Sequence, residues 1–393
     1  MASRFPIRDQ VAFAGVGTTP FTRNAGKSDL ALIVEASQNA MANAGVTRDD
    51  IDGIVGTMLP AHIVQGALGI PEITYFNNAF PTFPQQVIAA MNAVYSGACE
   101  TVLVYHCVGV SPFQSKASAS DPFRVRSAMM SSGAGRPISP WPDDIHFPPS
   151  YASWANRYFH EYEAKREYLG YIAINSRTNA GFNEHAPMKA PLSMEDYLAA
   201  RLVRGPLFGM LDMDYPVDGA DAFIITTVER AKSLKQKPVL LHSAALGQTK
   251  DTVEENMPSV HESAHQVTMK ALWDRSELTL DDVGLFLPYD GFSFICLKWF
   301  ENVGYCSLGE AGAFIKDNWD KEQNRILING TIPVNTHGGN LSDGATQGSG
   351  HTREAVLQLQ GTAGSHQVRG VKTALVPAGG FFMYTGALLL RTD

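Results

Sequence analysis

Cysteine is scarce in this chain: four thiols occur in 393 residues, and no two of them form a CxxC pair. This spacing excludes a zinc knuckle and a disulfide framework, so we expect reduced, mostly buried thiols and no metal site. Long apolar runs are also absent, because no window reaches the roughly 18 uncharged apolar residues that a membrane span needs. The first residues, MASRFPIRDQVAFAGVG, are too broken in hydrophobicity for a secretory signal. We therefore expect no membrane span and a cytoplasmic location.

Positive charge is in short supply. The 31 Lys and Arg residues are outnumbered by 39 Asp and Glu residues, the formal net charge is −8, and no long Lys/Arg run occurs. Such a surface disfavours non-specific binding to nucleic acid. Apolar residues are abundant at 45% of the chain, which is enough to bury a large sheet. The length allows two domains or one fold made of two similar halves.

An internal duplication is the most informative pattern that is present. Residues 46–55 read VTRDDIDGIV, and residues 278–287 read LTLDDVGLFL. One threonine and two aspartates align at a constant offset, namely Thr47, Asp49 and Asp50 with Thr279, Asp281 and Asp282. A repeat of about 230 residues is too long for a solenoid and indicates two half-molecules with one topology, related by a pseudo-twofold axis.

The flanks of the two copies share an order of elements. Each copy is preceded by a strand candidate and a helical stretch, and each is followed by an apolar run typical of a buried strand. The strand candidates are 11–15 and 239–245, and the helices are 30–44 and 265–275. Further strands are predicted at 101–105, 220–227, 325–327, 331–335, 373–377 and 383–391, and further helices at 85–96, 151–162, 167–180 and 350–361. The predicted class is α/β with strand-rich central layers.

A long insertion interrupts the first half. Residues 108–150 are rich in Ser, Pro and Gly, and four prolines follow between residues 186 and 216. Insertions of this length are often functional lids. The predicted division is 1–107 plus 217–235 for the N-terminal half, 108–216 for the lid insertion, and 236–393 for the C-terminal half.

Motifs spread over nearly the whole chain carry a family resemblance. They are VAFAGVGTTPF, ANRYFHEY, REYLGYIAINSRTNA, PLFGMLDMDYPVDGADAFIITTVERAKSL, LPYDGFSF, VGYCSLGEAGAFI and PVNTHGGNLSDGATQGSGH. With these segments the chain resembles the sterol carrier protein X-type thiolases. More narrowly, it resembles the thiolase-like lipid-transfer-protein aldolases of bacterial steroid side-chain degradation. The resemblance implies a five-layered αβαβα thiolase fold, a homodimer, a CoA thioester as ligand, and a small partner with an OB-fold and a zinc ribbon.

The reactive groups of a thiolase are missing from the matching segments. Phe80 stands at about the place of the nucleophilic Cys, and no Cys occurs between residues 59 and 98. Ala345 replaces the thiolase His, and Ala378, Gly379 and Gly380 of the segment PAGGFF occupy the place where a second Cys is expected. These three losses exclude Claisen thiolysis through an acylated Cys.

Tyr289 is the leading candidate for the remaining chemistry. It stands in LPYDGFSF at a strand end, and the resemblance implies that a Tyr in this turn belongs to a catalytic pair. A phenol in such a place acts as acid or base if its surroundings tune its pKa. The other reading is a strand-capping Tyr with its hydroxyl in water. The resemblance puts the second Tyr of the pair at Ala345, so another residue must supply that role or the activity differs.

His337 and Asp343 are the foremost candidates for the second role, followed by His351. Tyr384, close to the Gly379–Gly380 turn, is a further candidate to project into the pocket. His337 precedes two glycines, and a structural His bonded to a backbone carbonyl is the alternative. Asp343 at the following turn also fits a helix cap.

Glycine turns are expected to hold the thioester oxygen. Gly338, Gly339, Gly379 and Gly380 allow close backbone approach and free N–H groups, and Asn77 matches the family's approach to the reactive loop. Arg124 and Arg126 lie in the insertion and are candidates for CoA contacts, or for a solvated arginine pair. Aromatic residues flank these loops and suggest an apolar pocket for a bulky acyl group: Phe76, Phe80, Phe83, Phe381 and Phe382.

The sequence favours a retro-aldolase, a carbon–carbon lyase that cleaves a bulky steroid or aromatic β-hydroxyacyl-CoA to a short acyl-CoA and a ketone or aldehyde. This reaction needs no cofactor in the chain, since CoA is part of the substrate. Two alternatives remain open. One is a non-catalytic, thiolase-like subunit that binds acyl-CoA or scaffolds a partner. The other is an atypical acyltransferase that uses Cys107 as nucleophile.

Overall fold

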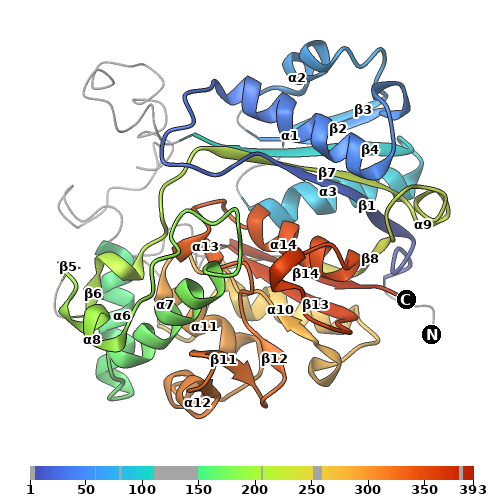
Figure 1. Ribbon diagram of the computed structural model, residues 1–393. Helices are drawn as coiled ribbons and strands as arrows, with labels where there is room; N and C mark the ends of the chain where they lie inside the picture. The colour runs from blue at the N-terminus through green and yellow to red at the C-terminus, as the bar shows by residue number, and fades with distance from the viewer. Residues whose placement is uncertain are drawn as a thin grey trace.

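A computed structural model describes residues 5–57, 59–78, 82–109, 149–204, 207–250, 259–379 and 384–393 (Figure 1). Six positions that sequence analysis singled out lie outside these ranges: Phe80, Arg124, Arg126, Gly380, Phe381 and Phe382.

The predicted duplication is present as two copies of one local structure. In each copy a threonine caps a short 3-10 turn, Arg48–Asp50 in the first half and Leu280–Asp282 in the second. The aspartate three residues later accepts the backbone N–H of Thr47 at 2.8 Å, or that of Thr279 at 2.8 Å. This reciprocal capping satisfies donors that a helix start leaves open. It explains why a threonine and an aspartate recur at the same spacing.

In the part of the first half that the structure describes, five strands are covered by helices. The strands are β1 (Val11–Thr18), β2 (Gly53–Gly56), β3 (Tyr75–Asn78), β4 (Thr101–Val108) and β7 (Gly219–Thr227). The helices are α1 (Asp29–Ala44), α2 (Ala61–Leu68), α3 (Phe83–Ser96) and α9 (Val228–Ala231). β2 is parallel to β3 and β4, whereas β7 is antiparallel to both β4 and β1.

The second half repeats this arrangement. Its strands are β8 (Val239–Gln248), β9 (Leu285–Phe286), β13 (Thr373–Ala378) and β14 (Tyr384–Arg391), with β10 (Trp319–Asp320), β11 (Arg325–Ile328) and β12 (Ile332–Pro333) in a small separate sheet. Its helices are α10 (Ala264–Asp274), α11 (Ser293–Val303), α12 (Ala311–Asp317), α13 (Gly339–Ser342) and α14 (Ser349–Gln360). The main strands follow the order β3-β2-β4-β7-β1-β8-β14-β13-β9, and the halves meet where β1 pairs with β8.

Five layers follow one another in Figure 1, from α1 and α2 down to α10 and α11. Among the described residues, three large apolar cores lie between these layers. One core lies between α1, α2 and the first half-sheet. A second encloses α3 and α14 between the two half-sheets. The third lies between the second half-sheet, α10 and α11, and extends to the insertion. This αβαβα order confirms the predicted fold class.

The described part of the insertion packs beside the second half. It holds α6 (Pro149–Glu161), α7 (Glu167–Ala180), α8 (Met194–Ala199), β5 (Leu202–Arg204) and β6 (Phe208–Gly209). Helix α7 is tied to the loop after β12, because Asn175 and Asn179 both donate to the carbonyl of Val334, at 3.0 and 2.8 Å. The insertion therefore supports the loop that carries the glycine turn of the candidate site.

Candidate active site

Tyr289 lies in the turn between β9 and α11, where its backbone N–H donates to the carbonyl of Pro377 at 2.9 Å. The side chain is 7% exposed, and its ring folds back over Gly291. A Cβ added at Gly291 would lie 2.6 Å from the phenol oxygen. Glycine is therefore required at this position, and it fixes where the phenol points.

Asp290, the next residue, is fully buried and heavily hydrogen-bonded. Its carboxylate accepts Nε2 of His351 at 3.0 Å, Oγ of Ser176 at 3.2 Å and the backbone N–H of Asn340 at 2.6 Å. The glycine turn thus binds an anion, but the anion is the chain's own Asp290. A Cβ at Gly339 (φ 59°) would collide with this carboxylate, which explains the glycine there.

Gly338 also differs from the free donor that the sequence predicts. Its N–H donates to the carbonyl of Asn335 at 2.9 Å, and its φ of 108° is one that residues with a side chain rarely adopt. Gly379 has a φ of 143°, and a Cβ there would lie 2.9 Å from the backbone of Thr385. Both glycines are therefore required by the backbone itself.

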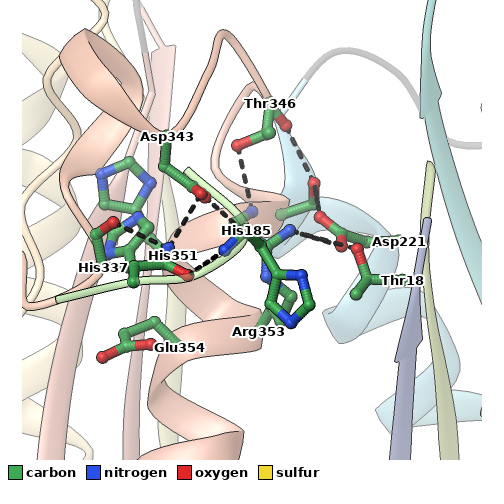
Figure 2. Close-up of polar contacts among 12 residues, drawn as sticks. Thr18, His185, Asp221, His337, Asp343, Thr346, His351, Arg353 and Glu354 are labelled. Atoms are coloured by element: carbon green, nitrogen blue, oxygen red, sulfur yellow. Dashed lines mark hydrogen bonds and ion pairs between the residues drawn. The ribbon is translucent and has the colours of Figure 1, made fainter. Parts of the chain in front are cut away.

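His351 and His337, both labelled in Figure 2, form a buried pair. The rings of His337 and His351 are 4.8 Å apart and nearly perpendicular, and the rings of Tyr289 and His351 are 5.9 Å apart. Burial, and then the charge of His351, lowers the pKa of His337 well below its usual value. At neutral pH His337 is therefore uncharged. It can donate or accept a hydrogen bond, but it is a poor store for a proton.

Asp343 lies in an ion network instead of facing an open site (Figure 2). Its carboxylate pairs with Arg353 and accepts Nδ2 of Asn183 at 3.0 Å. The other side of the Arg353 guanidinium pairs with Asp221 of β7 at 2.7 Å. All three charged residues are buried. This arrangement favours a structural role for Asp343.

Asp214 joins the site, and sequence analysis did not single it out. Its backbone N–H donates to the carbonyl of Gly291 at 2.9 Å, which fixes it beside Tyr289. The next residue, Tyr215, donates its N–H to Asn340 at 3.0 Å and accepts the N–H of Ala345 at 2.8 Å. The segment at Asp214 therefore runs between the Tyr289 turn and the vacated position at Ala345. Only the fold could show this, since Asp214 and Tyr289 lie 75 positions apart in the sequence.

Asn340 is a second residue that the sequence did not reveal. The side chain is buried, and its Oδ1 accepts the backbone N–H and the hydroxyl of Thr346 at 3.3 and 3.2 Å. Its amide lies beside the phenol of Tyr289, yet its Nδ2 makes no hydrogen bond of good geometry with any described residue. Asn340 thus offers a buried amide donor next to Tyr289.

The acid–base properties of the site follow from burial and crowded negative charge. Burial, and then the charges of Asp214 and Asp290, raise the pKa of Tyr289 well above its usual value. Burial, with Asp290 nearby, raises the pKa of Asp214 to about 7. Tyr289 is therefore a protonated phenol at neutral pH, whereas Asp214 exchanges its proton near neutrality.

The remaining candidates lie away from this cluster or are inert. Asn77, at the end of edge strand β3, donates to the hydroxyl of Tyr75 at 3.3 Å. Phe76 is 69% exposed, whereas Phe83 is fully buried in the middle core, so these two rings do not line a common pocket. Burial and three nearby aspartates raise the pKa of the Cys107 thiol, which is unsuited to act as a nucleophile.

Within the described ranges, no group of three or more His, Cys, Asp or Glu side chains is placed to hold a metal ion. No helix among the described residues is long and apolar enough to cross a membrane.

Comparison with solved structures places the fold among the thiolases. The human mitochondrial 3-ketoacyl-CoA thiolase superposes with a TM-score of 0.68 at 16% identity, over 98% of this chain and 100% of that one. The Ltp2-ChsH2(DUF35) aldolase superposes with a TM-score of 0.83 at 29% identity, over 98% and 99% of the two chains. Residues 247–392 match the family model described as "Thiolase C-terminal domain-like".

Comparison with curated proteins narrows the assignment. The 17-hydroxy-3-oxo-4-pregnene-20-carboxyl-CoA lyase of Mycobacterium tuberculosis is 31% identical over 98% of this chain and 100% of its own length. The steroid side-chain-cleaving aldolase of Thermomonospora curvata is 32% identical over 97% of this chain and 98% of its own length. The chain belongs to this family of thiolase-like, steroid side-chain-cleaving aldolases, as its motifs predict.

Proposed function

We propose that this chain is a retro-aldolase that cleaves a bulky β-hydroxyacyl-CoA, with a steroid or another ring system on the β-carbon. The observation that best supports this proposal is that Tyr289 lies in a buried polar cluster, while residues 59–98, where a thiolase has its nucleophilic Cys, hold no Cys at all. The names of the relatives in Mycobacterium tuberculosis and Thermomonospora curvata, a CoA lyase and a steroid side-chain-cleaving aldolase, support the same reaction class.

The reaction requires two proton movements and one stabilised charge. The β-hydroxyl loses its proton, the bond between Cα and Cβ breaks, and its electron pair forms the thioester enolate. That enolate then takes a proton at Cα. Tyr289 is suited to donate this proton, because a phenol with a raised pKa is protonated at neutral pH and is still a stronger acid than a thioester Cα–H.

The enolate oxygen needs donors that are in place before the reaction. The Nδ2 of Asn340, which lies beside the Tyr289 phenol, is the best candidate among the described residues. The neutral imidazole of His337 is a second one, since its Nδ1 has no partner within the described ranges. Gly339 and Gly379 keep a backbone role, and CoA enters only as part of the substrate.

Partners and location belong to the same proposal. The Ltp2-ChsH2(DUF35) aldolase is named as an assembly of two components, which supports a small OB-fold and zinc-ribbon partner for this chain. We also propose a homodimer, a cytoplasmic location, and CoA contacts from Arg124 and Arg126 in the insertion.

A direct test incubates the protein with a synthetic β-hydroxyacyl-CoA that carries a ring, and identifies products by mass spectrometry. Wild type and Tyr289→Phe are compared, each with and without a DUF35 partner protein. A ketone or aldehyde together with a short acyl-CoA, lost in the Phe variant, is expected. Intact substrate in every reaction would refute the lyase and favour an acyl-CoA-binding scaffold, for which the missing side chain at Ala345 is the motivating observation.

A further inference from the structure

The proposed reaction leaves the base that accepts the β-hydroxyl proton unassigned. Tyr289 is a poor choice, because a phenol whose pKa is raised by burial and by two carboxylates does not ionise near neutrality. His337 is held neutral by burial, and the carboxylate of Asp343 is engaged with Arg353 and Asn183. The base must therefore be sought elsewhere around Tyr289.

Asp214 has the position that a base requires. Its backbone is fixed to Gly291, the residue over which the Tyr289 ring folds. Its neighbour Tyr215 is fixed to Ala345, where the second side chain of the family's catalytic pair is missing. The small residue at position 345 therefore lies next to the segment that carries Asp214.

The carboxylate of Asp214 is also free to react. The residue keeps some solvent exposure although the protein around its carboxyl desolvates it, whereas Tyr289 and Asp290 are buried. No hydrogen bond to this carboxylate is formed within the described ranges, in contrast to Asp290, which accepts at least three. A carboxylate that is held only through its backbone can turn toward a substrate hydroxyl.

We infer that Asp214 is the general base of the reaction and Tyr289 its general acid, an assignment that rests on the proposed retro-aldolase function. Asp214 accepts the β-hydroxyl proton as the carbonyl of the departing ketone forms. Tyr289 donates its proton to Cα of the enolate. The carboxylic acid of Asp214 then returns a proton to the neighbouring phenolate, so the enzyme ends each cycle in its starting state and no net proton is consumed.

The charged groups around Asp214 explain why it can serve near neutral pH. Tyr289 and Asp290 face it from the turn after β9, with Tyr384 of β14 beyond Tyr289 and His351 of α14 bonded to Asp290. Negative charge prevails in this set, and together with burial it brings the pKa of Asp214 to about 7. Bases with a pKa near the working pH are the most effective. Two groups whose pKa values are pushed apart are the usual mark of an acid and base pair.

The test compares pH profiles of cleavage for wild type, Asp214→Asn, Asp214→Glu and Tyr289→Phe, with the same ring-bearing β-hydroxyacyl-CoA. Wild-type turnover should rise with pH through about 7, because only the ionised carboxylate accepts a proton. Asp214→Asn should lose roughly 10²–10⁴-fold in kcat together with this rising limb. Asp214→Glu should keep the limb at a lower rate. Tyr289→Phe should lower the rate, and any residual turnover should keep the limb.

A second measurement does not depend on turnover. Because the folded-state pKa of Asp214 lies above that of an unfolded Asp, its charge disfavours the folded state as pH rises. Asp214→Asn should therefore melt at a higher temperature than wild type at about pH 8, and at the same temperature at about pH 4. A cooperative melting transition of Asp214→Asn would also show that this variant is folded.

The outcomes separate the two levels of the argument. Cleavage by Asp214→Asn with the wild-type rate and pH profile would overturn the role of Asp214 and leave the retro-aldolase standing. Melting temperatures that differ equally at both pH values would contradict the perturbed carboxyl. No cleavage by wild type would overturn the retro-aldolase, and the base assignment with it.

Discussion

Arg353 offers a quantitative test of the buried ion network, and replacement by methionine is the perturbation of choice. The guanidinium bridges Asp221 of β7 and Asp343 near α13, lies over the ring of Phe21 at 5.0 Å, and is 5% exposed. Methionine keeps much of the side-chain volume but leaves two buried carboxylates without their cation. Breaking a buried pair by removing one partner costs about 3–5 kcal/mol.

The pH dependence of this loss gives the sharper prediction. Burial already raises the pKa of Asp343, and Arg353 is the largest opposing influence. Without Arg353 the pKa rises further, and each added unit is about 1.4 kcal/mol of preference for the neutral acid. A carboxyl whose pKa is higher in the folded state than in the unfolded state destabilises the folded state least when it is protonated. The stability loss of Arg353→Met should therefore be largest near pH 8 and should shrink as the pH falls toward 5.

Urea unfolding of wild type and Arg353→Met at about pH 5 and about pH 8 measures this difference. The matched control is the triple variant Arg353→Met, Asp221→Asn, Asp343→Asn, whose amide oxygens still accept from Ser349 and Asn183. It should recover most of the loss at pH 8. An equal loss at both pH values, or a triple variant as unstable as the single one, would refute the charge-based reasoning.

Three further predictions follow from single close contacts. Gly291→Ala should reduce cleavage by roughly 10²-fold or more in steady-state kinetics, because its methyl would lie 2.6 Å from the Tyr289 phenol oxygen. Gly66→Ala is the control, since an added Cβ there meets nothing within 4 Å. Equal activity of the two variants would contradict this prediction. Lys298→Met should destabilise the protein by about 3–5 kcal/mol in urea unfolding, since it leaves the carboxylate of Glu301 buried without its cation. A paired Glu301→Gln change removes that charge, keeps an oxygen to accept from Tyr158, and should restore most of the loss. Gly379→Ala should cost about 1–3 kcal/mol, because φ is 143° and the new Cβ would meet the backbone of Thr385 at 2.9 Å; an unchanged unfolding midpoint would contradict this.

Much of the fold could be predicted because its signals are local. The helix expected at 167–180 is α7 with the same bounds, and the strand expected at 373–377 is β13, one residue longer. The paired capping boxes mark equivalent points of the two halves, since each is written in four consecutive residues.

Helix α11 was not predicted from sequence, and its environment explains why. Ten of its eleven residues are buried, so it has no solvent-exposed polar face. Its charged members, Lys298 and Glu301, pair with each other inside the core, and Tyr158 donates to the same glutamate. Charges normally indicate a solvent-facing side, so this pairing concealed a core helix.

The candidate site was accessible to sequence reasoning only in part. Tyr289 stands in a local motif, whereas Asp214 and Asn340 reach it through backbone contacts that depend on the fold. Asp343 in sequence looks equally like a cap, a base or an ion-pair partner. Only the position of Arg353 on α14 distinguishes these roles.

The shared middle layer has a consequence for synthesis on the ribosome. Helix α3 emerges early, but its apolar face packs against α14, β13 and β14, which are the last elements to be made. Asp221 of β7 is likewise synthesised before Arg353, the residue with which it forms an ion pair. A nascent first half would therefore expose an apolar surface until the C-terminus is released. We expect truncated chains of this protein to aggregate or to require chaperones.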